Sequence, residues 1–185
     1  MKAILGLIAL AFLAVSAGCK RESETPPAQI RRPPPPLMRA LKETAFEPLT
    51  VDKTNHVYRF ICDRTFHEPF CFVLRVGPDG AGVLTRKMRS GPGGYDFGSI
   101  KEQHEATITA AKVSSFLTLL DQQNFWKLES GDDKIGFDGS WWFIEAVRTN
   151  RYQFVGRWTP KTNTPVGLIG RHLIEMAEWK IENLY

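Results

Sequence analysis

The spacing of apolar and polar residues from position 57 onward predicts a series of short strands. Residues 57–62 (VYRFIC), 70–76 (FCFVLRV) and 83–88 (VLTRKM) are rich in β-branched and aromatic residues, and the turn sequence GPDGAG separates the last two. Residues 104–108 (HEATI) alternate as a fourth strand. The glycine-rich stretch 90–98 is expected to be a surface loop. These segments predict consecutive hairpins of one antiparallel sheet.

Helical spacing follows this series of strands. Thr109 precedes apolar residues at positions 113, 116, 117 and 120, the spacing of one helix face behind an N-terminal cap. Residues 140–147 and 152–158 predict a second hairpin with a turn around 148–151, and Thr164 and Pro165 begin a helix expected to run to about residue 182. The order β-β-β-β-α-β-β-α predicts an α+β fold: an antiparallel sheet of five to six strands built from hairpins, with two amphipathic helices packed on it.

Residues 1–18 have the pattern of an export signal. Lys2 precedes an apolar run over residues 3–15 that is too short to be a comfortable permanent span, and small residues follow at 16–18. Cys19 comes directly after Ala-Gly, and this arrangement resembles the lipobox of bacterial lipoproteins, with Ser16 where Leu is favoured. The alternative is an ordinary signal that leaves Cys19 as a free thiol.

The lipoprotein resemblance implies a modification and a location in the cell. It implies cleavage before Cys19, diacylglycerol on its sulfur and an acyl chain such as palmitate on its new amino group. We therefore expect a lipid anchor in the bacterial cell envelope, with the chain facing the periplasm. Lys20, rather than Asp, follows the cysteine. In enterobacterial lipoproteins this pattern accompanies transfer to the outer membrane.

Residues 19–48 are predicted to be a proline-rich tether, and residues 49–185 a single globular domain. The tether holds seven of the 12 prolines, including four in succession at 33–36. Such runs favour an extended polyproline II conformation, so we expect a semi-rigid spacer. One or two helical turns at 37–46 are an additional hypothesis.

Composition narrows the class of protein further. A chain of 185 residues with 43% hydrophobic and 24% charged residues fits one globular domain, and neither a disordered chain nor a multi-span membrane protein. The net charge of +4 divides into +1 on the signal, +2 on the tether and +1 on the domain. This balance gives no basis for nucleic-acid binding, whereas arginines of the tether can contact anionic lipid headgroups.

Two cysteines remain in the domain once Cys19 is set aside. Cys62 and Cys71 lie in the two strands of the first hairpin, and an exported protein is in a compartment that allows disulfides. We expect a Cys62–Cys71 disulfide. Two buried thiols are the main alternative, and a metal site with His67 as third ligand is a further one.

Candidate catalytic chemistry is sparse. The histidines at positions 56, 67, 104 and 172 belong to no catalytic motif, and His67 is the most interesting because it lies between the two cysteines. Asp132, Asp133 and Asp138 gather near one loop, where solvated turn aspartates are the simplest interpretation and a hard-cation site is the alternative. No cofactor, metal or catalytic residue is therefore assigned.

The second hairpin carries the best candidate binding surface. With a two-residue turn, Trp141 and Glu145 share a face with Tyr152, Phe154 and Trp158, while Trp142 and Arg157 lie on the other face. Aromatic surfaces bind sugars or peptides, although tryptophans in a small sheet also serve as core. Glu145 lies within an apolar face, so it requires a partner, and Arg157 or Arg148 is expected. The candidate surface residues are Tyr95, Asp138, Trp142, Glu145, Arg157 and Trp158.

Two resemblances bear on the domain. The segments PDGAGVL (78–84), SGPGGY (90–95), FDGSWW (137–142) and RWTP (157–160) resemble a family of small uncharacterised bacterial envelope domains, a likeness that supports domain boundaries and implies no activity. SGPGGY is also similar to the SGxxY motif of membrane-bound inhibitors of c-type lysozyme, with one additional residue.

The sequence as a whole favours a lipid-anchored, periplasm-facing protein with a non-catalytic binding or envelope-assembly domain. The expected partners are the membrane, through Cys19, and an envelope protein or glycan. The alternatives are a hydrolase acting on envelope material, with His67 or Glu145 in an acid/base role, and a lysozyme-inhibitor-like protein.

Overall fold

The computed structural model describes residues 32–44, 56–131, 134, 136–149 and 151–185. Six antiparallel strands form one sheet in the order β4-β3-β2-β1-β5-β6. The strands are β1 (His56–Arg64), β2 (Phe70–Val76), β3 (Gly82–Arg89), β4 (Ile100–Ile108), β5 (Ser140–Arg148) and β6 (Arg151–Trp158). The predicted α+β class and the antiparallel sheet are therefore confirmed.

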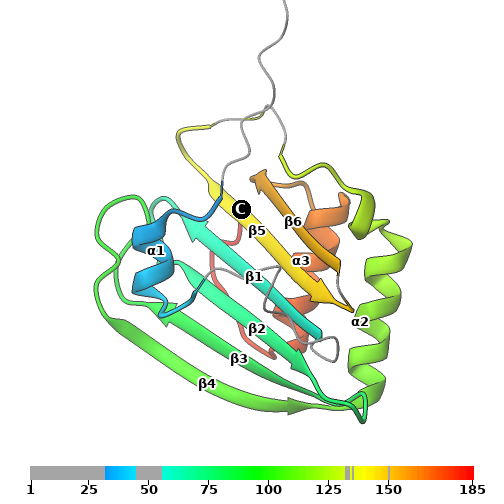
Figure 1. Ribbon diagram of the computed structural model, residues 1–185. Coiled ribbons are helices and arrows are strands. Elements are labelled where there is room, and N and C mark those ends of the chain that lie inside the picture. The colour runs from blue at the N-terminus through cyan, green and yellow to red at the C-terminus, as the bar shows by residue number, and fades with distance from the viewer. Residues whose placement is uncertain (1–31, 45–55, 132–133, 135, 150) are drawn as a thin grey trace, which may run out of the picture.

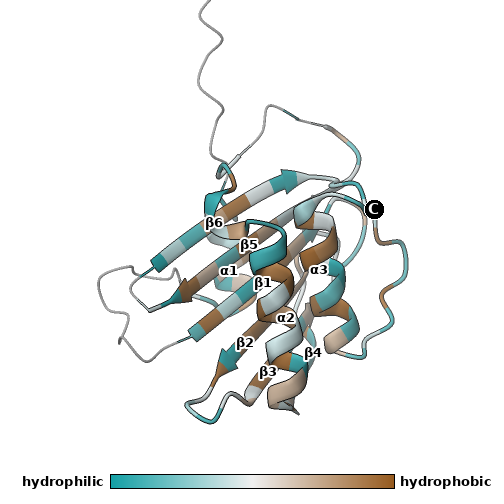
Figure 2. Cartoon of the chain, turned by 90° about the vertical axis from the view of Figure 1, so that its right-hand side faces the viewer, coloured by the Kyte–Doolittle hydropathy of each residue, from teal (hydrophilic) through white to brown (hydrophobic). Residues whose placement is uncertain are grey.

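Helices lie on both faces of the sheet (Figures 1 and 2). The longer helices α2 (Ala110–Gln122) and α3 (Pro165–Met176) cover one face, and the 3-10 turn η1 (Phe125–Lys127) follows α2. The short helix α1 (Pro35–Ala40) covers the other face. The two faces have separate cores because successive residues of a strand point to opposite sides.

The larger core lies between the sheet and the two long helices. Phe60 and Trp142 from the sheet meet Phe116 of α2 and Leu173 of α3, all with at most 2% of their surface exposed. Thr109 caps α2 and Thr164 caps α3, as predicted, through hydrogen bonds that their hydroxyl groups accept from the backbone. The hydrophobic spacing thus identified both packed helices.

Two element boundaries differ from the prediction. β4 begins at Ile100 rather than at residue 104, because its polar residues pair along β3 even though they are exposed. α3 ends at Met176 rather than near residue 182, and Glu178 after it adopts a positive φ of 51°. The chain after α3 has no regular structure: Trp179 packs against Phe70 and Phe72 of β2, and Tyr185 lies beside Ser140 of β5.

The second core differs most from expectation, because part of the predicted tether belongs to the domain. Leu37 and Leu41 are fully buried against Ile61, Val73 and Phe143 on the face that α1 covers. Pro34 precedes the helix with φ −58° and ψ 138°, the polyproline II region. Residues 32–44 are therefore a packed strap rather than a spacer, while residues 19–31 and 45–48 of the predicted tether lie outside the described residues.

The two domain cysteines are free thiols in the structure, in contrast to the expected disulfide. Cys71 is paired with Ile61, and Cys62 is paired with Phe70, so the cysteines are one register position apart. Successive positions face opposite sides of the sheet, and Cys62 lies in the larger core while Cys71 lies beneath the strap. The sheet itself therefore separates the two sulfur atoms.

The proposed signal and Cys19 lie outside the described residues. Among the residues that are described, no helix has both the length and the apolar character needed to cross a bilayer.

Candidate functional site

A buried charged pair lies at the centre of the strap-covered face. Arg59 on β1 and Glu145 on β5 are directly paired, with 1% and 6% of their surfaces exposed. Glu145 Oε2 accepts hydrogen bonds from Arg59 Nε at 3.0 Å and from Arg59 Nη2. The expectation that Arg157 or Arg148 would pair with Glu145 is thus wrong, because the neighbouring strand β1 supplies the partner.

The strap closes a network around this pair. Glu43 accepts a hydrogen bond from Lys87 Nζ at 2.6 Å and forms an ion pair with Arg59 at 3.3 Å. Tyr152 donates its hydroxyl hydrogen to Glu145 Oε1 at 2.8 Å. Burial, followed by the nearby Glu145 carboxylate, raises the pKa of Tyr152 to about 12, so this hydroxyl remains a donor.

Arginine side chains hold the strap at further points, through one backbone carbonyl and through aromatic side chains. Arg89 Nη1 donates to the carbonyl of Ala40 at 2.8 Å, and Arg32 Nη1 donates to the hydroxyl of Tyr152 at 2.8 Å. The Arg32 guanidinium also lies 4.8 Å from the ring centroid of Phe154. The network therefore fastens the strap to the sheet, and both carboxylate oxygens of Glu145 take part in it.

A cleft with a volume of about 260 Å³ opens at the end of the sheet where β1 ends and β5 begins. Pro34 of the strap and the rings of Phe97, Trp141 and Trp158 form its apolar walls, and Asp63 and Thr65 add polar groups. Trp141 and Trp158 meet edge to face, with ring centroids 5.5 Å apart. An aromatic-walled hollow with a few polar atoms is the usual architecture of a binding site.

Glycines give the cleft its shape. A Cβ at Gly93 would lie 2.3 Å from Asp63 Oδ1 and 2.7 Å from the carbonyl oxygen of Arg64. A Cβ at Gly136 would lie 2.0 Å from the indole nitrogen of Trp158. The glycine-rich loop is thus pressed against β1, and the loop before β5 against Trp158.

Exposed aromatic side chains surround the mouth of this cleft. Phe66, Tyr95 and Phe137 have 50%, 74% and 97% of their surfaces exposed. The rings of Phe66 and Tyr95 are 6.3 Å apart, and Phe137 lines the cleft beside Gly94, the residue before Tyr95. Three loops therefore present large apolar rings to the solvent at one end of the molecule.

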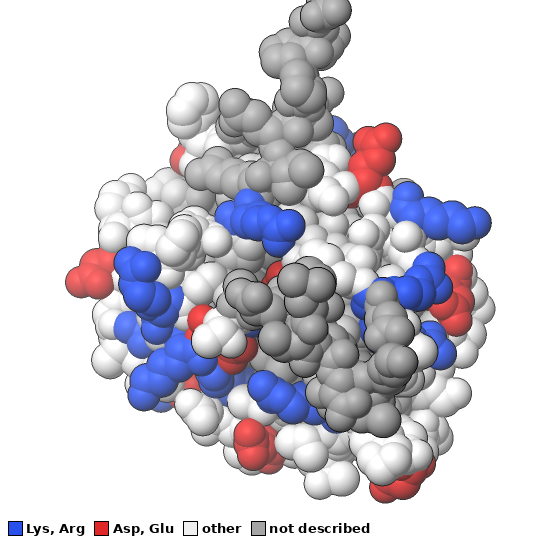
Figure 3. All heavy atoms as spheres, in the orientation of Figure 1, with Lys and Arg blue, Asp and Glu red and all other residues white. Residues whose placement is uncertain are grey.

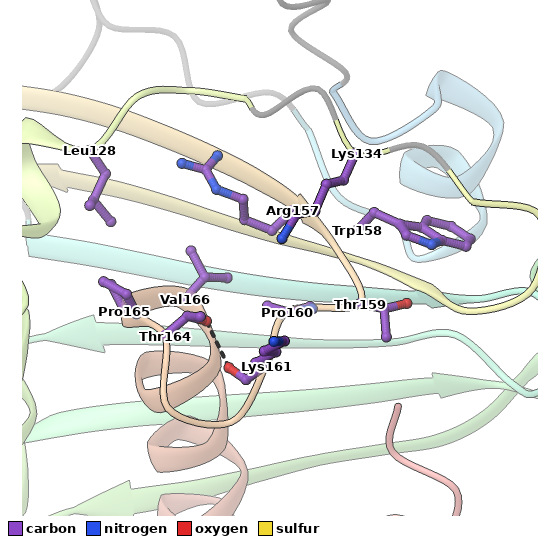
Figure 4. A pocket seen from close by; sticks show the side chains of 10 residues that line it. All are labelled: Leu128, Lys134, Arg157, Trp158, Thr159, Pro160, Lys161, Thr164, Pro165 and Val166. Atoms are coloured by element: carbon purple, nitrogen blue, oxygen red, sulfur yellow. Dashed lines mark hydrogen bonds between the residues drawn. The ribbon is translucent and has the colours of Figure 1, made fainter.

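A second hollow lies on the other side of Trp158 (Figure 4). Arg157 and Lys134 reach over it, Lys161 borders it from the segment before α3, and Leu128 closes its far side. Arg157 donates hydrogen bonds to the carbonyl oxygens of Gly156 and Glu129, each at 2.8 Å. Trp158 is thus the shared wall of an aromatic hollow and a basic one.

The candidate surface residues from the sequence divide into two groups. Tyr95 and Asp138 are exposed near the cleft, and Trp158 and Arg157 line the hollows. Trp142 and Glu145 are buried, on opposite faces of β5, so they contribute to the core and to the ionic network instead. Of the six candidate residues, two are therefore buried, and the other four remain candidates for a binding surface.

His67 is tied to the last residues of the chain. Its Nδ1 lies 3.0 Å from the hydroxyl of Tyr185, and its Nε2 lies 3.1 Å from Nδ2 of Asn183. Arg64 donates a hydrogen bond to the carbonyl of Glu182 at 2.7 Å, which fixes the same segment. Both ring nitrogens of His67 are thus occupied in positioning the C-terminal segment, which argues against the acid/base role.

The described residues hold no group of three or more His, Cys, Asp or Glu side chains suited to a metal ion. Asp132 and Asp133 of the aspartate cluster lie outside the described residues.

Charged side chains of both signs are interspersed over the visible part of the strap-covered face (Figure 3).

Comparison of the chain with protein-family models and with curated proteins gives no match.

Proposed function

We propose that the protein is a lipid-anchored lipoprotein of the bacterial envelope, facing the periplasm, whose domain is a non-catalytic binding module. The ligand site comprises the two hollows that share Trp158, and the ligand is a glycan or protein segment of the envelope. The observation that carries the proposal is the aromatic cleft between Trp141, Trp158 and the glycine-rich loop. Flat rings at such a site stack on the apolar faces of sugars and extended peptides.

The ionic network supports a binding role over an enzymatic one. A general acid or base must reach a substrate proton, and Glu145 is buried with both carboxylate oxygens engaged by Arg59 and Tyr152. The groups that line the cleft are mainly rings and glycines, together with the carboxylate of Asp63 and the hydroxyl of Thr65, a lining that suits recognition by shape, stacking and a few polar contacts.

Photo-crosslinking from Lys161 tests the binding module. A benzophenone amino acid replaces Lys161, which is exposed and borders the basic hollow, in cells that express the full chain. We expect one discrete adduct with an envelope component, and we expect Trp158→Ala to abolish it because the shared wall is lost. The matched control places the probe at Val83, which is 43% exposed and lies near the start of β3, at the end of the sheet away from the cleft. No adduct from position 161, or one that Trp158→Ala leaves unchanged, contradicts the proposal.

A further inference from the structure

The three exposed aromatic residues at the cleft mouth come from three separate loops. Phe66 follows β1, Tyr95 lies between β3 and β4, and Phe137 precedes β5. These rings are exposed rather than packed in either core. A partner that covered all three would remove a large apolar area from water. Because the three rings lie at one end of the molecule, a single partner surface can contact all of them at once.

The route of the N-terminal segment indicates what lies opposite that end. Pro34 forms part of the cleft wall, so the chain meets the domain beside the three aromatic loops (Figure 1). Residues 20–31 separate Cys19 from Arg32, and a fully extended stretch of this length spans about 45 Å at most. If Cys19 is acylated, the aromatic end is the part of the domain tethered directly to the bilayer.

We infer that Phe66, Tyr95 and Phe137 form a membrane-contact surface that inserts into the interfacial region of the bilayer carrying the Cys19 anchor. The inference rests on the proposed lipid anchor and adds a second, independent contact with the same membrane. Aromatic side chains favour the boundary between headgroups and acyl chains. The cleft then opens at the membrane surface, so its ligand must be accessible there.

The charges at this end set the expected lipid dependence. Asp96 and Asp138 lie in the same loops as Tyr95 and Phe137, and Lys134 is exposed in the loop that precedes β5. This mixture favours no strong attraction to anionic headgroups, so the rings must supply most of the affinity. We therefore expect binding to persist at high salt, which screens electrostatic contacts.

Vesicle sedimentation tests the inference without the lipid anchor. The mature chain carrying Cys19→Ser is mixed with phosphatidylethanolamine–phosphatidylglycerol vesicles, alone and with Phe66→Ser, Tyr95→Ser and Phe137→Ser combined. We expect the Cys19→Ser chain to sediment with vesicles at low and high salt, and the triple aromatic change to weaken binding about tenfold or more. Val83→Ser is the matched control, an exposed apolar residue at the distal end of β3.

Three results overturn the inference: no sedimentation of the Cys19→Ser chain, equal binding by the triple variant and the Val83→Ser control, or loss of all binding at high salt. Circular dichroism and the melting temperature establish that the triple variant is folded, as its exposed positions lead us to expect. Because this assay uses no acylated protein, its failure is distinct from failure of the proposed anchor, which is read from the mass of Cys19.

Discussion

Arg59 and Glu145 are direct cross-strand partners between β1 and β5, and they form a buried ion pair on the face that the N-terminal strap covers. Charges removed from water in this way are costly unless each is matched. The strap supplies Glu43, which forms ion pairs with Arg59 and Lys87 of the sheet. The buried charges of the sheet therefore also hold residues 32–44 in place.

Removing one member of the pair should strongly destabilise the domain. We expect Glu145→Ala to lower the free energy of unfolding by about 3–5 kcal/mol, because Arg59 loses its main partner while it remains buried. The combined change Arg59→Met and Glu145→Leu should be closer to the wild type than Glu145→Ala is. Urea unfolding monitored by tryptophan fluorescence measures all three. A double variant less stable than the single one would contradict this account of the pair.

Residues 32–44 should contribute to stability as core does. Leu37 is fully buried in the second core, so we expect Leu37→Ala to cost about 2–5 kcal/mol. Pro36→Ala in the same helix is the matched control, because Pro36 is exposed, and it should change stability little. Thermal unfolding of the two variants measures the difference. Equal melting temperatures would mean that the segment is a spacer after all.

The domain thiols should be reduced and protected. In the Cys19→Ser chain, we expect maleimide to label Cys62 and Cys71 very slowly in the native state, because both are fully buried. In denaturant without reductant, both should label completely, as intact-protein mass spectrometry will show. Labelling that appears only after a reductant is added would establish the disulfide instead.

Stability should fall in strongly alkaline solution. Burial raises the pKa of the Cys62 thiol from 9.0 to about 12. The unfolded chain therefore loses this proton at a lower pH than the folded one, and the free energy of unfolding falls between about pH 9 and 12, by at most about 1.4 kcal/mol per pH unit for this group. Burial raises the pKa of Tyr58 to about 12 as well, which adds to the loss above pH 10. Urea unfolding across this range should show a shallower pH dependence for Cys62→Ala; identical slopes would rule out this thiol as a cause.

Local patterns predicted the sheet and the two long helices, because each of these elements has its own periodicity and cap. Thr109 and Thr164 show this directly, since both cap their helices as expected. The second hairpin was predicted with its turn around residues 148–151, and the shared face was derived on the condition of a two-residue turn. The pairing of Arg148 with Arg151 meets that condition and places Trp141 opposite Trp158. These relationships are short-range, so the sequence contains them.

Relationships between distant segments were not predictable in this way. Strand order decides that Arg59, rather than Arg148 or Arg157, lies beside Glu145. An arginine on the same strand face as Val57 and Ile61 was a signal that could have identified this partner. The polyproline run concealed the strap, since only tertiary contacts bury Leu37. The disulfide was expected from hairpin pairing without its register, and one position of shift moves a side chain to the other face.

The mass of the mature N-terminus is the most direct test of the account, which depends on a lipid anchor at Cys19. Mass spectrometry of the N-terminal peptide, from protein purified from bacterial membranes, should show a chain that begins at Cys19 and carries a diacylglyceryl group and an amide-linked acyl chain. Cys19→Ser should carry no acyl mass. An unmodified Cys19 in a mature chain recovered from the soluble periplasm would contradict the account.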